Sequence, residues 1–129
     1  MSSEQVRERC YVVYAVAPPA VSASEANDAL NAYIDDRRRG IVVFHDHFIG
    51  SPHGGFAVFD IRSQEEHALL DDPGPLAGWQ LHVHALTFSL SAVGFVEQAG
   101  FTVREYAKTS FEELRATEPE DPRFWWQRH

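Results

Sequence analysis

The fold is decided by residues 41–61, IVVFHDHFIGSPHGGFAVFDI. Two runs rich in β-branched and aromatic residues flank a turn of Gly, Ser and Pro, which predicts a β-hairpin. Because alternate side chains of a strand share a face, we expect His45 and His47 on one face and Phe44 and Phe48 on the other. Asp46 then falls among apolar side chains, which indicates a bulge or a frayed strand end.

A second histidine strand is predicted over residues 80–88, QLHVHALTF. His82 and His84 share one face of it, and Leu81 and Val83 lie on the other. The apolar face fixes the register, because a slip by one residue would bury both imidazoles. His82 and His84 are therefore preferred over the hairpin histidines as the functional pair.

Outward from these strands, residues 9–17 (RCYVVYAVA) predict a first strand that ends at two prolines. Ser22 and Glu25 have the spacing of a capping box, and an apolar stripe follows, which predicts a helix over residues 23–38. Gly40 is expected to end this helical segment after an arginine cluster at residues 37–39.

A second capping box, Ser63 and Glu66, predicts a short helix before Asp72 and Pro73. The order strand, helix, strand, strand, helix, strand predicts an α+β, ferredoxin-like fold. In it, a four-stranded antiparallel sheet carries both helices on one face. We expect one domain over residues 1–129, with its core at about residues 10–88.

Residues 89–129 are predicted as a C-terminal extension of this fold. They include a short helix over residues 90–98 that is closed by Gly100, a strand over residues 101–106 and a helix that follows Ser110. The aromatic tail at residues 124–126 would be costly to leave in water, so we expect it to dock on its own domain or on a partner subunit.

Composition excludes several partners and sites. A net charge of −8 argues against nucleic acid and anionic membranes, which select for basic surface. The polar start of the chain and the absence of a long apolar run predict a cytoplasmic protein. Cys10 is the only cysteine, so neither an internal disulfide nor a cysteine-ligated metal site is expected within one chain.

Residues 54–73, GGFAVFDIRSQEEHALLDDP, followed by Ala77 and Gly78, resemble YCII-related proteins of the dimeric α/β-barrel superfamily. Muconolactone isomerases are similar at the level of the fold. The resemblance implies a homodimer formed through the open sheet face and a small-molecule ligand in the lumen. The active site of YCII-related proteins uses a histidine near the first helix, and residues 23–38 contain none, so no catalytic residue is carried over.

All four strand histidines, His82, His84, His45 and His47, are expected to line this lumen, and three interpretations compete for them. The first is acid-base catalysis without a cofactor on an apolar or aromatic substrate, because imidazole exchanges protons near neutral pH. The second is a histidine-ligated metal site, since paired imidazoles suit zinc, copper, iron or nickel. The third is a dimer that binds a small ligand, or serves as an accessory protein, without catalysis.

The aromatic residues beside these strands are candidates for substrate binding. Tyr11 or Tyr14, depending on register, is expected to face the lumen, and Trp79 is a candidate pocket wall. His67 is expected to be a solvated helix residue and His53 a loop residue without a role.

Overall fold

The computed structural model describes residues 9–87 and 89–118 of the chain. The chain divides into two compact units, Met1–Phe95 and Val96–His129. The aromatic tail at residues 124–126 lies outside the described residues, so its predicted docking stays a prediction.

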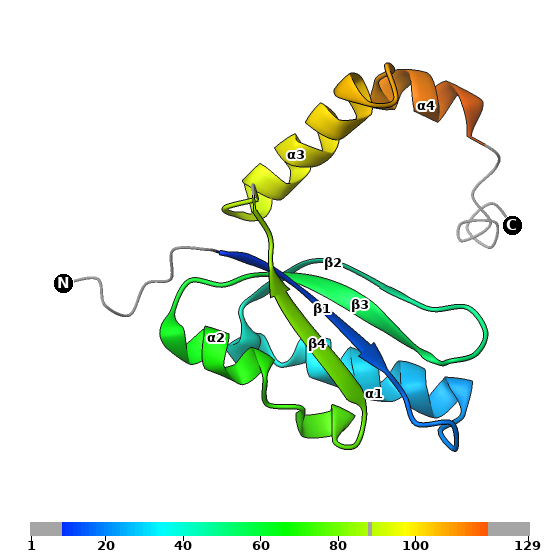
Figure 1. Ribbon diagram of the computed structural model, residues 1–129, viewed down its shortest axis with the longest axis vertical. Coiled ribbons are helices and arrows are strands. Elements are labelled where there is room, and N and C mark those ends of the chain that lie inside the picture. Colours follow the sequence, from blue (N-terminus) through cyan, green and yellow to red (C-terminus); the bar gives the residue numbers. More distant parts are fainter. Residues whose placement is uncertain (1–8, 88, 119–129) are drawn as a thin grey trace, which may run out of the picture. The chain divides into compact units, whose positions relative to one another are not determined.

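The first unit contains an antiparallel sheet of four strands in the order β2-β3-β1-β4 (Figure 1). The strands are β1 (Cys10–Val16), β2 (Ile41–His47), β3 (Gly54–Asp60) and β4 (Gln80–Ala85), and the helices are α1 (Ala23–Asp35) and α2 (Gln64–Leu70). Short 3-10 turns, η1 (Arg37–Arg39) and η2 (Gly74–Leu76), follow the helices. The prediction of an α+β, ferredoxin-like fold is confirmed.

Both helices begin at the predicted serines. The Oγ atom of Ser22 accepts a hydrogen bond from the N–H of Glu25 at 3.1 Å, and the Glu25 carboxylate accepts one from the N–H of Ser22 at 3.0 Å. At α2, Ser63 accepts from the N–H of Glu66 at 3.2 Å, but the Glu66 carboxylate reaches one residue further back, to the N–H of Arg62. Helix starts of this chain are thus set by local side-chain hydrogen bonds.

Helix α1 is shorter than the predicted span of residues 23–38. Asp36 leaves the helix with extended backbone angles and caps η1 by accepting a hydrogen bond from the N–H of Arg38 at 3.2 Å. Hydrogen bonds from Arg38 hold the pKa of the Asp36 carboxyl well below its usual range. Gly40 then turns the chain into β2 with φ of 100°, a backbone conformation that favours glycine.

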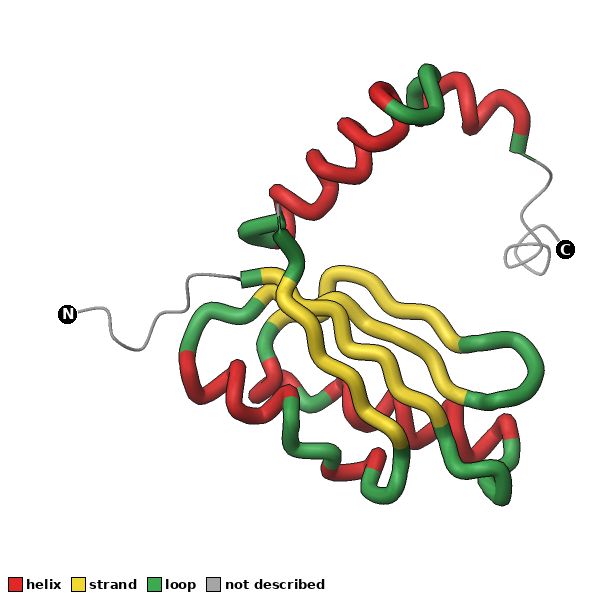
Figure 2. The backbone as a smooth tube through the Cα atoms, in the orientation of Figure 1, coloured by secondary structure: helices red, strands yellow, loops and turns green. Residues whose placement is uncertain are grey.

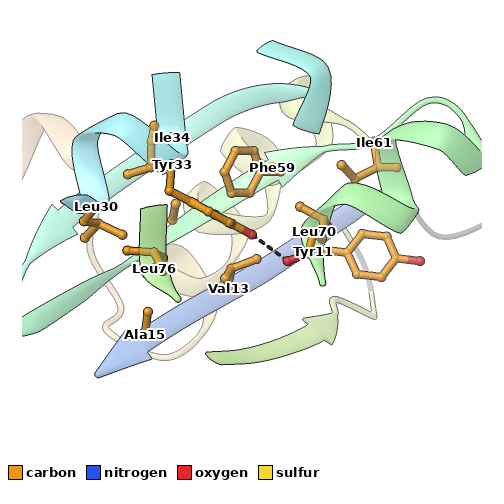
Figure 3. Close-up of a cluster of buried hydrophobic side chains, with 11 residues drawn as sticks. Tyr11, Val13, Ala15, Leu30, Tyr33, Ile34, Phe59, Ile61, Leu70 and Leu76 are labelled. Atoms are coloured by element: carbon orange, nitrogen blue, oxygen red, sulfur yellow. Dashed lines mark hydrogen bonds between the residues drawn. The ribbon is translucent and has the colours of Figure 1, made fainter. Parts of the chain in front are cut away.

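The core lies between the sheet and the two helices, which cover the same face (Figure 2 and Figure 3). Tyr33 of α1 is fully buried, packs edge-on against Phe59 of β3, and donates a hydrogen bond from its hydroxyl to the carbonyl of Leu70 at 2.7 Å. Leu81 and Val83 of β4 pack against this cluster, as their alternation predicted. Burial of these side chains is the main favourable term in folding.

The predicted strand over residues 101–106 is wrong. Helix α3 (Ala92–Glu105) runs through Gly100, which was expected to end a helix over residues 90–98. Its start is stabilised by Ser91, whose Oγ atom accepts from the N–H of Gly94, and after its end Lys108 adopts a positive φ of 56°. A six-residue alternation does not outweigh a longer run of helical spacing.

In the second unit, α4 (Phe111–Thr117) begins after Ser110 as predicted, and Ser110 accepts from the N–H of Glu113. Within the described part of the chain, no helix has the length and apolar character needed to cross a bilayer.

Candidate functional site

The sheet face opposite α1 and α2 carries a set of aromatic and imidazole rings. The register of β1 places Tyr14 between His82 of β4 and Phe56 of β3, while Val12 lies opposite His84. This surface is called the histidine face, and it consists of Val12, Tyr14, Phe44, Asp46, Phe56, Val58, His82 and His84. The prediction that His82 and His84 point away from the helices is therefore confirmed.

Three of these rings are stacked. The ring of Tyr14 lies 4.5 Å from that of His82, with 16° between their planes, and 6.2 Å from that of His84, with 17° between the planes. Within residues 9–87 and 89–118, neither imidazole nor the Tyr14 hydroxyl makes a hydrogen bond, so these polar atoms are free to contact a ligand. A flat ring could stack beside them while imidazole nitrogens exchange protons with it.

The hairpin histidines lie on the other face of the sheet. The register between β2 and β3 shifts between Val42 and Phe44, so that a bulge at Val43 precedes the pairs His45 with Ala57 and His47 with Gly55. Ala57 belongs to the buried core. The expectation that His45 and His47 line the same lumen as His82 and His84 is therefore wrong, because one extra residue reverses which side chains face the helices.

The same bulge accounts for Asp46. Phe44 and Asp46 now point to the histidine face, where Asp46 pairs with Phe56 and the Phe44 ring lies 5.6 Å from the Phe56 ring. Of the two alternatives that the sequence left open for Asp46, the bulge is the one present. It lies three residues before the aspartate.

On the helix face, His47 is tied to α1. Its Nε2 atom lies 3.0 Å from the Oδ1 atom of Asn31, and because a carbonyl oxygen only accepts, Nε2 donates. The Nδ1 atom of His47 is buried and has no hydrogen-bond partner among the described residues. The ring of His45 lies 5.7 Å from that of His47 and is nearly perpendicular to it.

A groove of about 800 Å³ lies between α1 and the edge strand β2. It is called the arginine groove, and its polar lining consists of Asn31, Asp35, Arg37, His45 and Arg62. Ile34, Ile41 and Val42 supply apolar surface. All five polar side chains are exposed, so the groove is open to solutes.

The remaining candidates are dispersed. Tyr11 is buried on the helix face, and its ring centroid lies 4.9 Å from that of His67 with 64° between the ring planes. His67 is half-buried, so the expectation of a solvated residue is wrong. Trp79 is half-buried and packs against the core cluster. His53 is half-buried in the β2–β3 turn, where its carbonyl accepts from the N–H of Ala17.

The two histidine pairs lie on opposite faces of one sheet, so they cannot converge on one metal ion within a chain. Among residues 9–87 and 89–118, no group of three or more histidine, cysteine, aspartate or glutamate side chains is arranged to hold a metal ion.

Sequence reasoning missed Arg37 and Arg62 as site residues. A signal for them exists in the hairpin itself, because antiparallel pairing of Ile41 with Asp60 brings the residues before β2 beside those after β3. A charged residue just outside each end of a hairpin is therefore a candidate for a shared site.

Searches with protein-family models, among curated proteins and among solved structures find no match to this chain. Its likeness to YCII-related proteins and to the dimeric α/β-barrel superfamily therefore stays a prediction, which depends on residues 54–73 and on the order of its strands and helices.

Proposed function

We propose that this chain forms a homodimer through the histidine face and catalyses proton transfer on a small, largely apolar or aromatic molecule. His82 and His84 act as the acid and the base, and the reaction is of the isomerase, lyase or monooxygenase type without a cofactor. The observation that carries the proposal is the parallel stack of Tyr14 with both imidazoles, whose nitrogens are unpaired in the described part of the chain.

The stack supports distinct roles for its members. Tyr14 is 37% exposed and provides an aromatic surface on which a flat substrate can lie. His82 is half-buried and His84 is exposed, so the two imidazoles have different surroundings.

The dimer is supported by apolar surface on the same face. Phe44 is 49% exposed and lies beside Phe56, next to the exposed ring of Tyr14. A second copy of this face would bury these rings and enclose the imidazoles away from water.

Sedimentation of the full chain at micromolar concentration tests the dimer. We expect a dimer that dissociates when Phe44→Asp places a charge in the interface, while Phe111→Asp, a matched change in α4, leaves it intact. A wild-type chain that sediments as a stable monomer would refute dimerisation through this face.

Proton exchange tests the chemistry without a known substrate. Small aromatic lactones, phenols and ketones are incubated with the protein in D₂O, and NMR follows the incorporation of deuterium at activated C–H groups. We expect exchange of at least one class of compound to be lost in His82→Ala or His84→Ala and kept in His53→Ala. Full exchange in the His82→Ala, His84→Ala double variant would place the chemistry elsewhere.

A second candidate function is binding of a flat ligand without catalysis. It is favoured by one observation: in the described part of the chain no carboxylate forms a hydrogen bond with His82 or His84, whereas catalytic imidazoles are commonly oriented by one. Ligands that bind the wild-type protein and lose affinity in Tyr14→Ala, but never exchange protons, would support this candidate over the enzyme.

A further inference from the structure

The arginine groove concentrates positive charge in an acidic protein. The chain has a net charge of −8. The described part of its first unit contains no lysine, and its arginines are Arg9, Arg37, Arg38, Arg39 and Arg62. How each guanidinium is used decides where an anion could be held.

Three of these guanidinium groups are already engaged. Arg9 forms an ion pair with Asp60 at 3.0 Å, and Arg38 forms one with Asp36 at 2.7 Å. Arg39 is buried and donates to backbone carbonyls and to Asp36. None of the three lines the arginine groove.

The other two guanidinium groups, those of Arg37 and Arg62, both line the groove. Within the described residues, neither makes a side-chain hydrogen bond or an ion pair. Every unpaired cation in the described part of this unit therefore lies at one groove.

The backbone on both sides of the groove is fixed. The N–H of Arg62 donates to the Glu66 carboxylate at 2.8 Å, and Arg37 begins the turn that Asp36 caps. Because the backbones are held while the guanidinium groups are unpaired, a ligand would order only the two side chains.

The polar groups that line the groove indicate which class of ligand fits it. Guanidinium groups match the geometry of carboxylate and phosphate oxygens, and the His45 ring adds a nitrogen that has no hydrogen-bond partner among the described residues. The Asp35 carboxylate repels a bare anion but accepts hydrogen bonds. The Oδ1 atom of Asn31 also accepts hydrogen bonds. A ligand that carries a hydroxyl or amino group next to its acidic group would satisfy both the guanidinium donors and the oxygen acceptors of the groove.

We propose that the arginine groove is a binding site for a small organic anion, whose carboxylate or phosphate group is held by Arg37 and Arg62 with His45 as a further contact. The site lies on the helix side of the sheet and uses none of the residues of the histidine face. It is therefore independent of the function proposed above, and each proposal can fail without the other.

The test is a titration of the full chain, in a buffer without phosphate and at constant ionic strength, with inorganic phosphate, succinate and malate in turn. Backbone amide shifts in two-dimensional NMR report the site and the dissociation constant. We expect saturable shifts at residues 37–41 and at residue 62. Tighter binding of phosphate identifies a phosphate ligand, and tighter binding of malate identifies a hydroxy acid.

Arg37→Ala and Arg62→Ala should each weaken binding about tenfold, since a charge-assisted hydrogen bond is lost. Arg38→Ala is the matched control, because it removes the same charge from the same turn but from a residue outside the groove; it should leave binding within about twofold. Circular dichroism verifies that each variant is folded. Equal weakening by Arg38→Ala, or no saturable shift with any of the three probes, overturns the proposal.

Discussion

Replacing Arg39 by methionine should destabilise the first unit by about 3 kcal/mol or more, because it leaves several carbonyl oxygens without the donor that the buried guanidinium provides. Arg39 is 2% exposed. It donates to the carbonyls of Leu69 at 3.1 Å, Tyr33 at 3.2 Å and Asp72 at 2.9 Å, and to the Asp36 carboxylate at 3.1 Å. It thereby joins the end of α1 to the end of α2.

The magnitude follows from these contacts. Methionine keeps much of the apolar volume, so the loss comes mainly from carbonyls that lose a donor, at about 1–3 kcal/mol for each one that stays buried. The guanidinium also lies 4.0 Å above the Tyr33 ring, a contact worth about 0.5–2 kcal/mol. Release from the cost of burying a charge offsets part of this sum.

Arg38→Met provides the comparison. The Arg38 side chain is 72% exposed and pairs with Asp36, and exposed pairs contribute about 0–1 kcal/mol. Urea unfolding followed by circular dichroism gives both free energies of unfolding. If the free energy of unfolding of Arg39→Met lies within about 1 kcal/mol of that of Arg38→Met, then the cost of desolvating the Arg39 guanidinium equals the free energy of its hydrogen bonds, and the reasoning is refuted.

Three further predictions concern a thiol, a phenol and a glycine. Burial and the nearby Asp60 raise the pKa of Cys10, against the effect of Arg9, so DTNB should modify this fully buried thiol far more slowly than in the same chain unfolded in guanidinium; rapid native reaction would contradict this. Burial raises the pKa of Tyr33 from 10.0 to about 12. The folded state therefore holds this proton more tightly than the unfolded state does. The stability that Tyr33 contributes is fully present below pH 10 and should be lost between pH 10 and pH 12 in the wild type, whereas Tyr33→Phe should lack this part of the pH dependence. Gly40→Ala should cost about 1–3 kcal/mol, because its Cβ would lie 2.7 Å from the Asp60 carbonyl at a φ of 100°; Gly50→Ala, with φ of 81° and open space around it, is the control and should cost less.

Local signals predicted most of the fold. The serines at 22, 63 and 110 mark helix starts because their hydroxyls bond to backbone N–H groups three residues away. The face of β4 was predictable as well, because Leu81 and Val83 require burial and leave only one orientation for His82 and His84. In each case the decisive interaction lies within one element or one turn.

The errors concern features that depend on a partner element. A bulge at Val43 cannot be located from the run 41–47, because its side chains alternate equally well in either register, and only pairing with β3 selects one. Residues 101–106 alternate as a strand does, but helix α3 has already begun upstream and continues through them. His67 was expected in solvent because the ring that it contacts, that of Tyr11, belongs to a strand far away in the sequence.

Net charge illustrates the same limit for function. A value of −8 argues against partners such as nucleic acid, which contact a large surface, but it does not describe a single groove. What matters there is which cations remain after local pairing. Asp60 engages Arg9, and Asp36 engages Arg38 and contributes to Arg39, so acidic residues engage the other cations in the described part of the unit and leave Arg37 and Arg62. Among the described residues of the first unit, this groove is therefore where an anion would meet unpaired guanidinium groups.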